Sequence, residues 1–150
     1  MLTSPDFKEL LSTLAKHKVR YLVVGGYAVM KYTEPRFTKD LDLWIATDPE
    51  NAEAVFAALK EFGAPLTNLA PADFAHAGYF YQMGSPPFRL DIMMDIPGVA
   101  FEAAWANREE SQVEGLTIPF ISKADLIKTK EASGRDQDRL DVKRLRKTAN

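Results

Sequence analysis

Two aspartates one residue apart are the strongest candidates for chemistry in this chain. Asp40 and Asp42 enter an apolar stretch that runs to Ile45. Alternate side chains of a strand share a face, so both carboxylates would lie on one side together with Trp44. Trp44 could stack on a base there, but we favour a role in the core beneath the site. Carboxylates held this close repel each other, and Mg²⁺, which takes carboxylate, phosphate and water oxygens, would relieve the repulsion.

A double glycine lies upstream of the acid pair, directly after the strand-like run Tyr21–Val24. Gly25 and Gly26 carry no Cβ, so backbone N–H groups can approach an anion closely. The helix expected to begin there adds the attraction of its N-terminus for phosphate. This combination predicts a site for a metal-bound triphosphate and weighs against two merely solvated aspartates. Arg36 and Thr38 could also contact phosphate, although a surface turn explains both equally well.

A third carboxylate is predicted on the strand-like run Phe88–Met93. Asp91 is flanked by apolar residues, and a buried acid there would need a partner. If this strand lies beside that of the acid pair, Asp91 completes a three-carboxylate cluster that binds two divalent ions and takes a proton from an attacking hydroxyl. An ion pair with Arg89 is the alternative, and Asp95 is the reserve candidate for the third acid.

Periodicity and turn residues predict an α+β chain, in an α/β two-layer arrangement. Helices are expected near residues 5–17, 28–35, 48–63 and 99–106, followed by a C-terminal pair separated by Gly134. Strands are expected near 20–24, 40–45, 79–83 and 88–93 and around Gly115, which gives a sheet of about four to six strands. Residues 63–78 form a loop without an assigned role. We predict one domain over residues 1–150, with a core to about 121 and C-terminal helices over about 122–147.

Composition narrows the protein class. The 150 residues are 46% hydrophobic and 27% charged, which is typical of a globular domain. The absence of cysteine excludes disulfides, thiolate zinc sites and a cysteine nucleophile. No leader and no long apolar run is visible, so we expect a soluble, cytoplasmic protein without membrane contact. The segment Lys123–Lys147 holds nine Lys or Arg against five Asp or Glu, which suits a small polyanion better than a nucleic-acid duplex.

The glycine pair, the Asp-x-Asp and the later strand acid resemble the nucleotidyltransferase superfamily of the DNA polymerase β type. More narrowly, Val24-Gly25-Gly26-Tyr27-Ala28 and Pro35-Arg36-Phe37-Thr38-Lys39-Asp40-Leu41-Asp42 are similar to small bacterial nucleotidyltransferases related to type IV abortive-infection toxins. The tail agrees, since Asp125-Leu126-Ile127-x-x-Lys130 and Gly134-Arg135-x-x-Asp138-x-x-Asp141 resemble that family's C-terminal helical motif. The resemblance implies a nucleotidyltransferase fold, with a mixed β-sheet, helices packed on one face and a C-terminal helical pair.

The activity that the resemblance implies is Mg²⁺-dependent transfer of a nucleoside monophosphate from a nucleoside triphosphate to an acceptor hydroxyl, with release of pyrophosphate. Mn²⁺ could replace Mg²⁺. The implied roles are backbone phosphate contacts for the two glycines, metal binding for the acid pair, an acceptor-side ligand or general base in Asp91, and neutralisation of phosphate charge by Lys130.

The acceptor stays open at this point, since a small molecule, the end of a transfer RNA and a protein side chain all fit. A role beside a cognate protein partner, as in a toxin–antitoxin pair, also fits the resemblance. The alternative from another class is a catalytically weak nucleotide-fold binding module, or an antitoxin that works through a protein partner. A crowded, self-repelling carboxylate cluster favours the enzyme, because a module without chemistry has no need of it.

Overall fold

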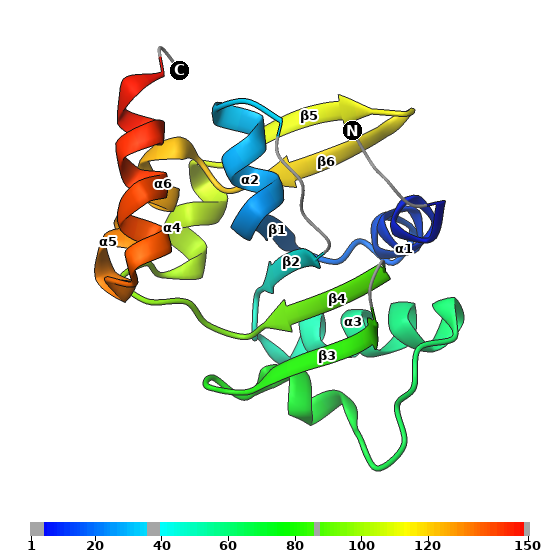
Figure 1. Ribbon diagram of the computed structural model, residues 1–150. Coiled ribbons are helices and arrows are strands. Elements are labelled where there is room, and N and C mark those ends of the chain that lie inside the picture. Colours follow the sequence, from blue (N-terminus) through cyan, green and yellow to red (C-terminus); the bar gives the residue numbers. More distant parts are fainter. Residues whose placement is uncertain (1–4, 36–39, 86–87, 149–150) are drawn as a thin grey trace.

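The computed structural model describes residues 5–35, 40–85 and 88–148, and it has helices at both ends of the chain around a central sheet (Figure 1). The helices are α1 (Pro5–Lys16), α2 (Gly25–Tyr32), α3 (Pro49–Phe62), α4 (Phe101–Ala106), α5 (Lys123–Ser133) and α6 (Asp136–Lys147), with a 3₁₀ helix η1 (Pro71–Ala75). The strands are β1 (Tyr21–Val24), β2 (Asp40–Ile45), β3 (Phe80–Ser85), β4 (Phe88–Met93), β5 (Glu109–Val113) and β6 (Leu116–Phe120). The expected C-terminal helical pair is present.

The six strands form one mixed sheet in the order β3-β4-β2-β1-β6-β5. β2 is parallel to β4 and β1 is parallel to β6, while the other neighbours are antiparallel. This confirms the predicted mixed sheet of four to six strands. It also confirms that the strand of Asp91 lies next to the strand of Asp40 and Asp42.

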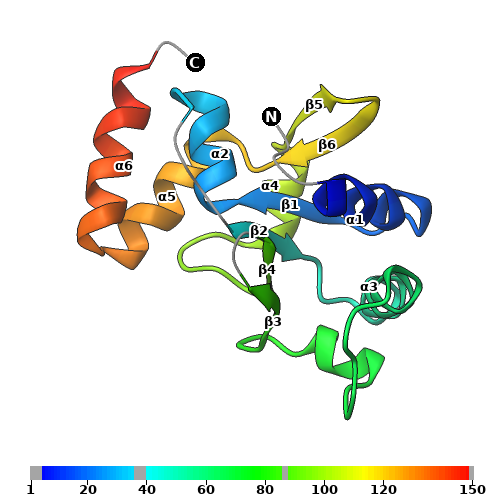
Figure 2. The ribbon, with the colours of Figure 1, turned by 45° about the vertical axis from the view of Figure 1, so that its right-hand side comes forward.

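The two faces of the sheet differ in chemistry. Leu41, Leu43 and Ile45 are almost fully buried, and they share their face with Leu90 and Ile92 of β4. Helices α1 and α3 lie on one side of the sheet and α5 and α6 on the other (Figure 2). The sheet therefore has an apolar face against α1 and α3 and a face that carries the predicted acids.

The expectation that helices pack on one face holds for α1 and α3, but α4 lies on the acid face. Phe101 of α4 packs edge-on against Trp44, with ring centroids 5.0 Å apart. Trp44 is only 2% exposed, which confirms its predicted role in the core. The large apolar ring on an otherwise acidic face has to be covered, and α4 provides the cover.

The ends of several helices follow directly from local sequence. Asp48 caps α3 by accepting a hydrogen bond from the Asn51 N–H, and Ser122 caps α5 by accepting one from the Asp125 N–H. Gly63 and Gly134 end these two helices in the left-handed conformation, as predicted. No helix in the described ranges is both long and apolar enough to cross a bilayer.

Candidate active site

Asp42 and Asp91 meet at the centre of the acid face. They are partners in register on the parallel strands β2 and β4, and their side chains share a hydrogen bond. Burial, the neighbouring charges of Asp91 and Asp40 and this hydrogen bond raise the pKa of Asp42 to about 7, while Lys130 opposes the rise. Asp42 and Asp91 therefore lie together on the acid face, and Asp40 is close enough for its charge to raise the pKa of Asp42.

Asp91 is held in place by two neighbours. Its Oδ1 accepts a hydrogen bond of 2.8 Å from Nε2 of Gln82 and lies 3.5 Å from Nε of Arg89. The ion pair with Arg89, considered as an alternative to a role in the site, is thus present together with the contact to Asp42. Asp91 has a fixed orientation and still reaches the acid cluster.

The carboxylate oxygens of this cluster decide whether it suits a metal ion. No three His, Asp or Glu side chains of the described ranges are grouped so as to hold a metal ion. Asp42 and Asp91 instead contact each other through their shared hydrogen bond. A hard divalent cation between them would meet the oxygen donors it prefers. The donor chemistry therefore fits Mg²⁺, and metal binding by Asp40, Asp42 and Asp91 stays a prediction.

Gly25 lies against Asp42 so closely that no other residue fits. A Cβ at Gly25 would collide with Oδ2 of Asp42 and stand 2.8 Å from its Cγ, and the backbone has φ +68°, in the left-handed region. α2 begins at this residue, and its N-terminus has no side-chain cap. The N–H groups of this helix start, which the N-cap residue Val24 does not cap with its side chain, thus lie beside the carboxylates, an arrangement suited to phosphate. Gly26 follows in the first turn of α2.

A cavity of about 600 Å³ joins these features. Its wall comes from the junction of β1 with α2, from β2, from β3, β4 and the segment after β4, and from α5 with the turn to α6. It brings together five of the predicted site residues, which are Gly25, Asp40, Asp42, Asp91 and Lys130. Asp95, the reserve acid, also lines it, while Gly26 is not among the described lining residues. The predicted phosphate contacts Arg36 and Thr38 lie outside the described residues.

Lys130 reaches the cavity from α5 but is already paired. Its Nζ lies 3.1 Å from Oδ1 of Asp138 and 3.1 Å from Oδ2 of Asp141, and all three side chains are nearly buried. The two aspartates of α6 thus both pair with the same base of α5. Burial alone would raise the pKa of Asp138, but hydrogen bonds from Ser133, Arg135 and Lys130 hold it below its usual value. The pairing fixes Lys130 at the position from which it acts on Asp42.

Arg135 is a cavity residue to which the sequence had assigned no role. It directly precedes α6, its Nε donates to Oδ2 of Asp138 at 2.8 Å, and its side chain is 78% exposed. The remaining guanidinium N–H groups are thus available at the cavity wall. The signal in the sequence was the arginine directly after the helix-ending Gly134, at a turn between two basic helices.

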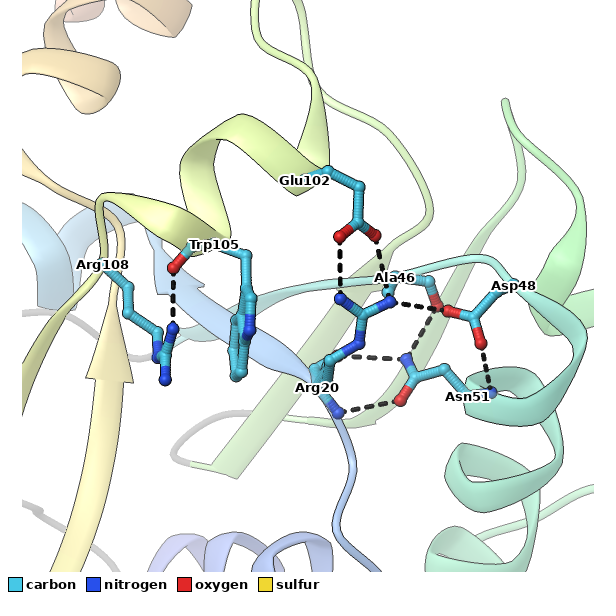
Figure 3. A network of polar contacts seen from close by, with 7 residues as sticks. All are labelled: Arg20, Ala46, Asp48, Asn51, Glu102, Trp105 and Arg108. Atoms are coloured by element: carbon cyan, nitrogen blue, oxygen red, sulfur yellow. Dashed lines mark hydrogen bonds and ion pairs between the residues drawn. The ribbon is translucent and has the colours of Figure 1, made fainter.

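A polar network fixes α4, and with it the lining segment that precedes this helix. Arg20 pairs with both oxygens of Glu102 on α4 at 2.9 and 3.0 Å and with Asp48 at the start of α3 (Figure 3). Asn51 adds hydrogen bonds with the backbone of Arg20 and Ala46. The network joins β1, α3 and α4, so the segment between β4 and α4, which contains Asp95, is anchored at both ends.

A profile of the aminoglycoside-2''-adenylyltransferase family matches residues 6–145. The chain belongs to this family. No curated protein sequence matches the chain significantly. The lincosamide antibiotic adenylyltransferase LnuA, in its lincomycin-bound structure, superposes with a TM-score of 0.62 at 17% identity, covering 97% of this chain and 98% of LnuA.

Two further structures share the fold. A proposed nucleotidyltransferase from Thermotoga maritima has a TM-score of 0.62 at 16% identity, over 91% of this chain and 88% of its own. An antigenic nucleotidyltransferase-like protein from Paracoccidioides brasiliensis has a TM-score of 0.54 at 16% identity, over 91% and 70%. This member of the aminoglycoside-2''-adenylyltransferase family therefore has a nucleotidyltransferase fold, and its family identifies it as an enzyme. The narrower relation to abortive-infection toxins stays a prediction.

Proposed function

We propose that this protein transfers an adenylyl group from ATP to a hydroxyl of an aminoglycoside-like small molecule, with release of pyrophosphate. One observation carries the proposal: the hydrogen-bonded pair Asp42–Asp91 lies against the uncapped start of α2 in a single cavity. Phosphoryl transfer depends mainly on positioning and on stabilisation of charge, and this arrangement supplies both. The reaction class follows from the family.

The phosphates of ATP are assigned to the wall built by α2, α5 and the turn to α6. Gly25, at the start of α2, and Arg135 both line the cavity, so the helix N-terminus and the guanidinium group are the donors assigned to phosphate. Lys130 adds positive charge from a position fixed by Asp138 and Asp141. Thr38 and Arg36 remain predicted phosphate contacts on the sequence alone.

In the chemical step, the acceptor oxygen forms a bond to the α-phosphorus of ATP. The bond from that phosphorus to the oxygen bridging to the β-phosphate breaks, and pyrophosphate leaves. Asp91 accepts the proton of the attacking hydroxyl, since Gln82 and Arg89 hold its carboxylate at the cavity. Asp40, Asp42 and Asp91 would hold Mg²⁺, which when bound stabilises negative charge on the phosphates and lowers the pKa of the attacking hydroxyl.

Two facts favour a small-molecule acceptor over an RNA end or a protein side chain. The family description names aminoglycosides, and LnuA, which is covered over nearly its whole length, is named for a lincosamide antibiotic. The cavity of about 600 Å³ has the size of a site for a drug-sized ligand.

The test is calorimetric titration with each nucleoside triphosphate, with and without Mg²⁺, followed by mass spectrometry of aminoglycosides incubated with protein and MgATP. We expect Mg²⁺-dependent binding of ATP that is lost in the double variant Asp40→Ala/Asp42→Ala, and an acceptor product heavier by one AMP. A folded protein that binds no triphosphate would contradict the proposal and favour a binding module.

A further inference from the structure

The cavity has a second wall of different chemistry, formed by the start of β3 and by the end of β4 with the segment after it. Its lining residues on this side are mostly apolar and include Tyr79, Phe80, Met93, Ile96 and Pro97. The wall opposite presents the start of α2, Lys130 and Arg135, which suit phosphate. A single cavity with one polar wall of hydrogen-bond donors and one apolar wall is adapted to two different ligand groups.

Phe80 is placed on the acid face by the register of the sheet. It pairs with Met93, and Gln82, two residues further along β3, pairs with Asp91. Since alternate residues of a strand share a face, Phe80 and Gln82 lie on the same side as Asp91. Phe80 is 65% exposed, and Gln82 contacts Asp91 directly. A large apolar ring therefore stands exposed beside the carboxylate assigned to the attacking hydroxyl.

Tyr79 and Asp95 extend this surface. Tyr79 is 48% exposed and stacks on His76, with ring centroids 3.9 Å apart and an interplanar angle of 14°. Asp95 lines the same cavity, is exposed, and has no hydrogen bond or ion pair with any described residue. The aromatic side chains and the carboxylate together offer an apolar platform beside a negative charge that no described residue compensates.

We propose that Tyr79, Phe80 and Asp95 form the acceptor subsite, and that this subsite binds a ring that carries an ammonium group. The apolar face of the ring lies on the aromatic side chains, and the ammonium lies beside Asp95. The proposal rests on the proposed function for the identity of the neighbouring nucleotide. Because the attacking and leaving oxygens are roughly in line, a pyrophosphate leaving toward α2 and Arg135 puts the acceptor on the β3–β4 side.

The probes are kanamycin, as a ring system with several ammonium groups, and an ATP analogue with a methylene between the α- and β-phosphates. Calorimetry measures the Kd of each probe for the wild type and for Phe80→Ala and Asp95→Asn, with kanamycin titrated both with and without the analogue and Mg²⁺. We expect each variant to weaken kanamycin binding by about tenfold and to leave the Kd of the analogue within about twofold. Asp95→Glu should restore most of the kanamycin affinity, because it restores the charge.

Leu140→Ala is the matched control for Phe80, since Leu140 is 52% exposed and lies on α6. Glu53→Gln, on the exposed side of α3, is the control for loss of one acidic charge. Loss of analogue affinity in Phe80→Ala would overturn the proposal and assign Tyr79 and Phe80 to the nucleotide base. Equal kanamycin affinity in all variants, or no kanamycin binding to the wild type, would also overturn it. Failure of the proposed function appears separately, as failure of the wild type to bind the analogue.

Discussion

The two walls of the cavity differ in how their side chains are held. On the α5–α6 wall, Lys130 is nearly buried and paired with two aspartates, and Arg135 is tied to one of them. On the β3–β4 wall, Phe80 and Asp95 are exposed, and Asp95 has no partner among the described residues. Paired charges hold the side chains of the wall assigned to the nucleotide. The nucleotide is the same substrate in every reaction cycle. The wall assigned to the acceptor has an aromatic ring and a carboxylate that the described part of the chain leaves exposed.

The largest expected effect comes from the acids between the walls. Asp42→Asn should reduce adenylyl transfer by about three orders of magnitude, because it removes a charge placed for the transition state. Thermal stability should stay equal or rise, since the variant relieves repulsion with Asp91 and Asp40. Rates at saturating ATP and a melting curve check both points. Asp136→Asn, at a fully exposed side chain, is the control, and a wild-type rate in Asp42→Asn would remove the acids from the mechanism.

Gly25→Ala should reduce transfer by about a hundredfold, because the new Cβ displaces Asp42 and misplacements of this size cost that much. It should also destabilise the fold by about 1–2 kcal/mol for the left-handed backbone alone. Gly63→Ala separates the two effects, since Gly63 has φ +94° and a Cβ added there would meet no atom within 4 Å. Denaturant unfolding and rates measured on both variants would show the cost of the left-handed backbone in each, but a loss of activity only in Gly25→Ala. Equal activities would contradict the close approach at Asp42.

Arg135→Gln should raise the KM for ATP by about tenfold, the value of a charge-assisted hydrogen bond, without changing acceptor affinity. This is the mirror image of the result expected for Phe80→Ala, so the pair of variants tests the division between the walls. Arg139→Gln is the control, because Arg139 is similarly exposed on α6 and its ion pair is with Asp136. If Arg135→Gln weakens the binding of both ATP and the acceptor, or of neither, the two walls do not act separately.

The last expected effect is on stability alone and is a pH dependence of the metal-free protein. The pKa of Asp42 is about 7 in the fold and 3.8 ordinarily, so the folded state binds the proton more tightly than the unfolded chain. Stability should therefore fall as pH rises from about 4 to about 7, and level off above. Melting temperatures with a chelator should decline over this range in the wild type and decline less in Asp42→Asn. If Mg²⁺ at pH ~8, above this range, does not raise the wild-type melting temperature, the acids do not bind it.

Much of the site was predictable because it depends on local rules. Period-two alternation put Asp40, Asp42 and Asp91 on faces of strands, and the glycine pair predicted the start of a helix, which the structure has at Gly25. Capping by Asp48 and Ser122 and the stops at Gly63 and Gly134 also follow from short stretches of sequence. Each of these inferences needs only the geometry of one element.

The tertiary structure decided what depends on which elements are neighbours. Only the register of β2 with β4 pairs Asp42 with Asp91, and only the packing of α5 on α6 buries Lys130 between two aspartates. The tertiary structure also decided the place of α4 on the acid face, the position of Arg135 at the cavity wall and the exposure of Phe80 beside Asp91. Contacts between residues far apart in the chain arise from the assembled fold, so no local pattern encodes them. The sequence by itself determined which chemical groups this enzyme has, and the fold determined which of them face each other.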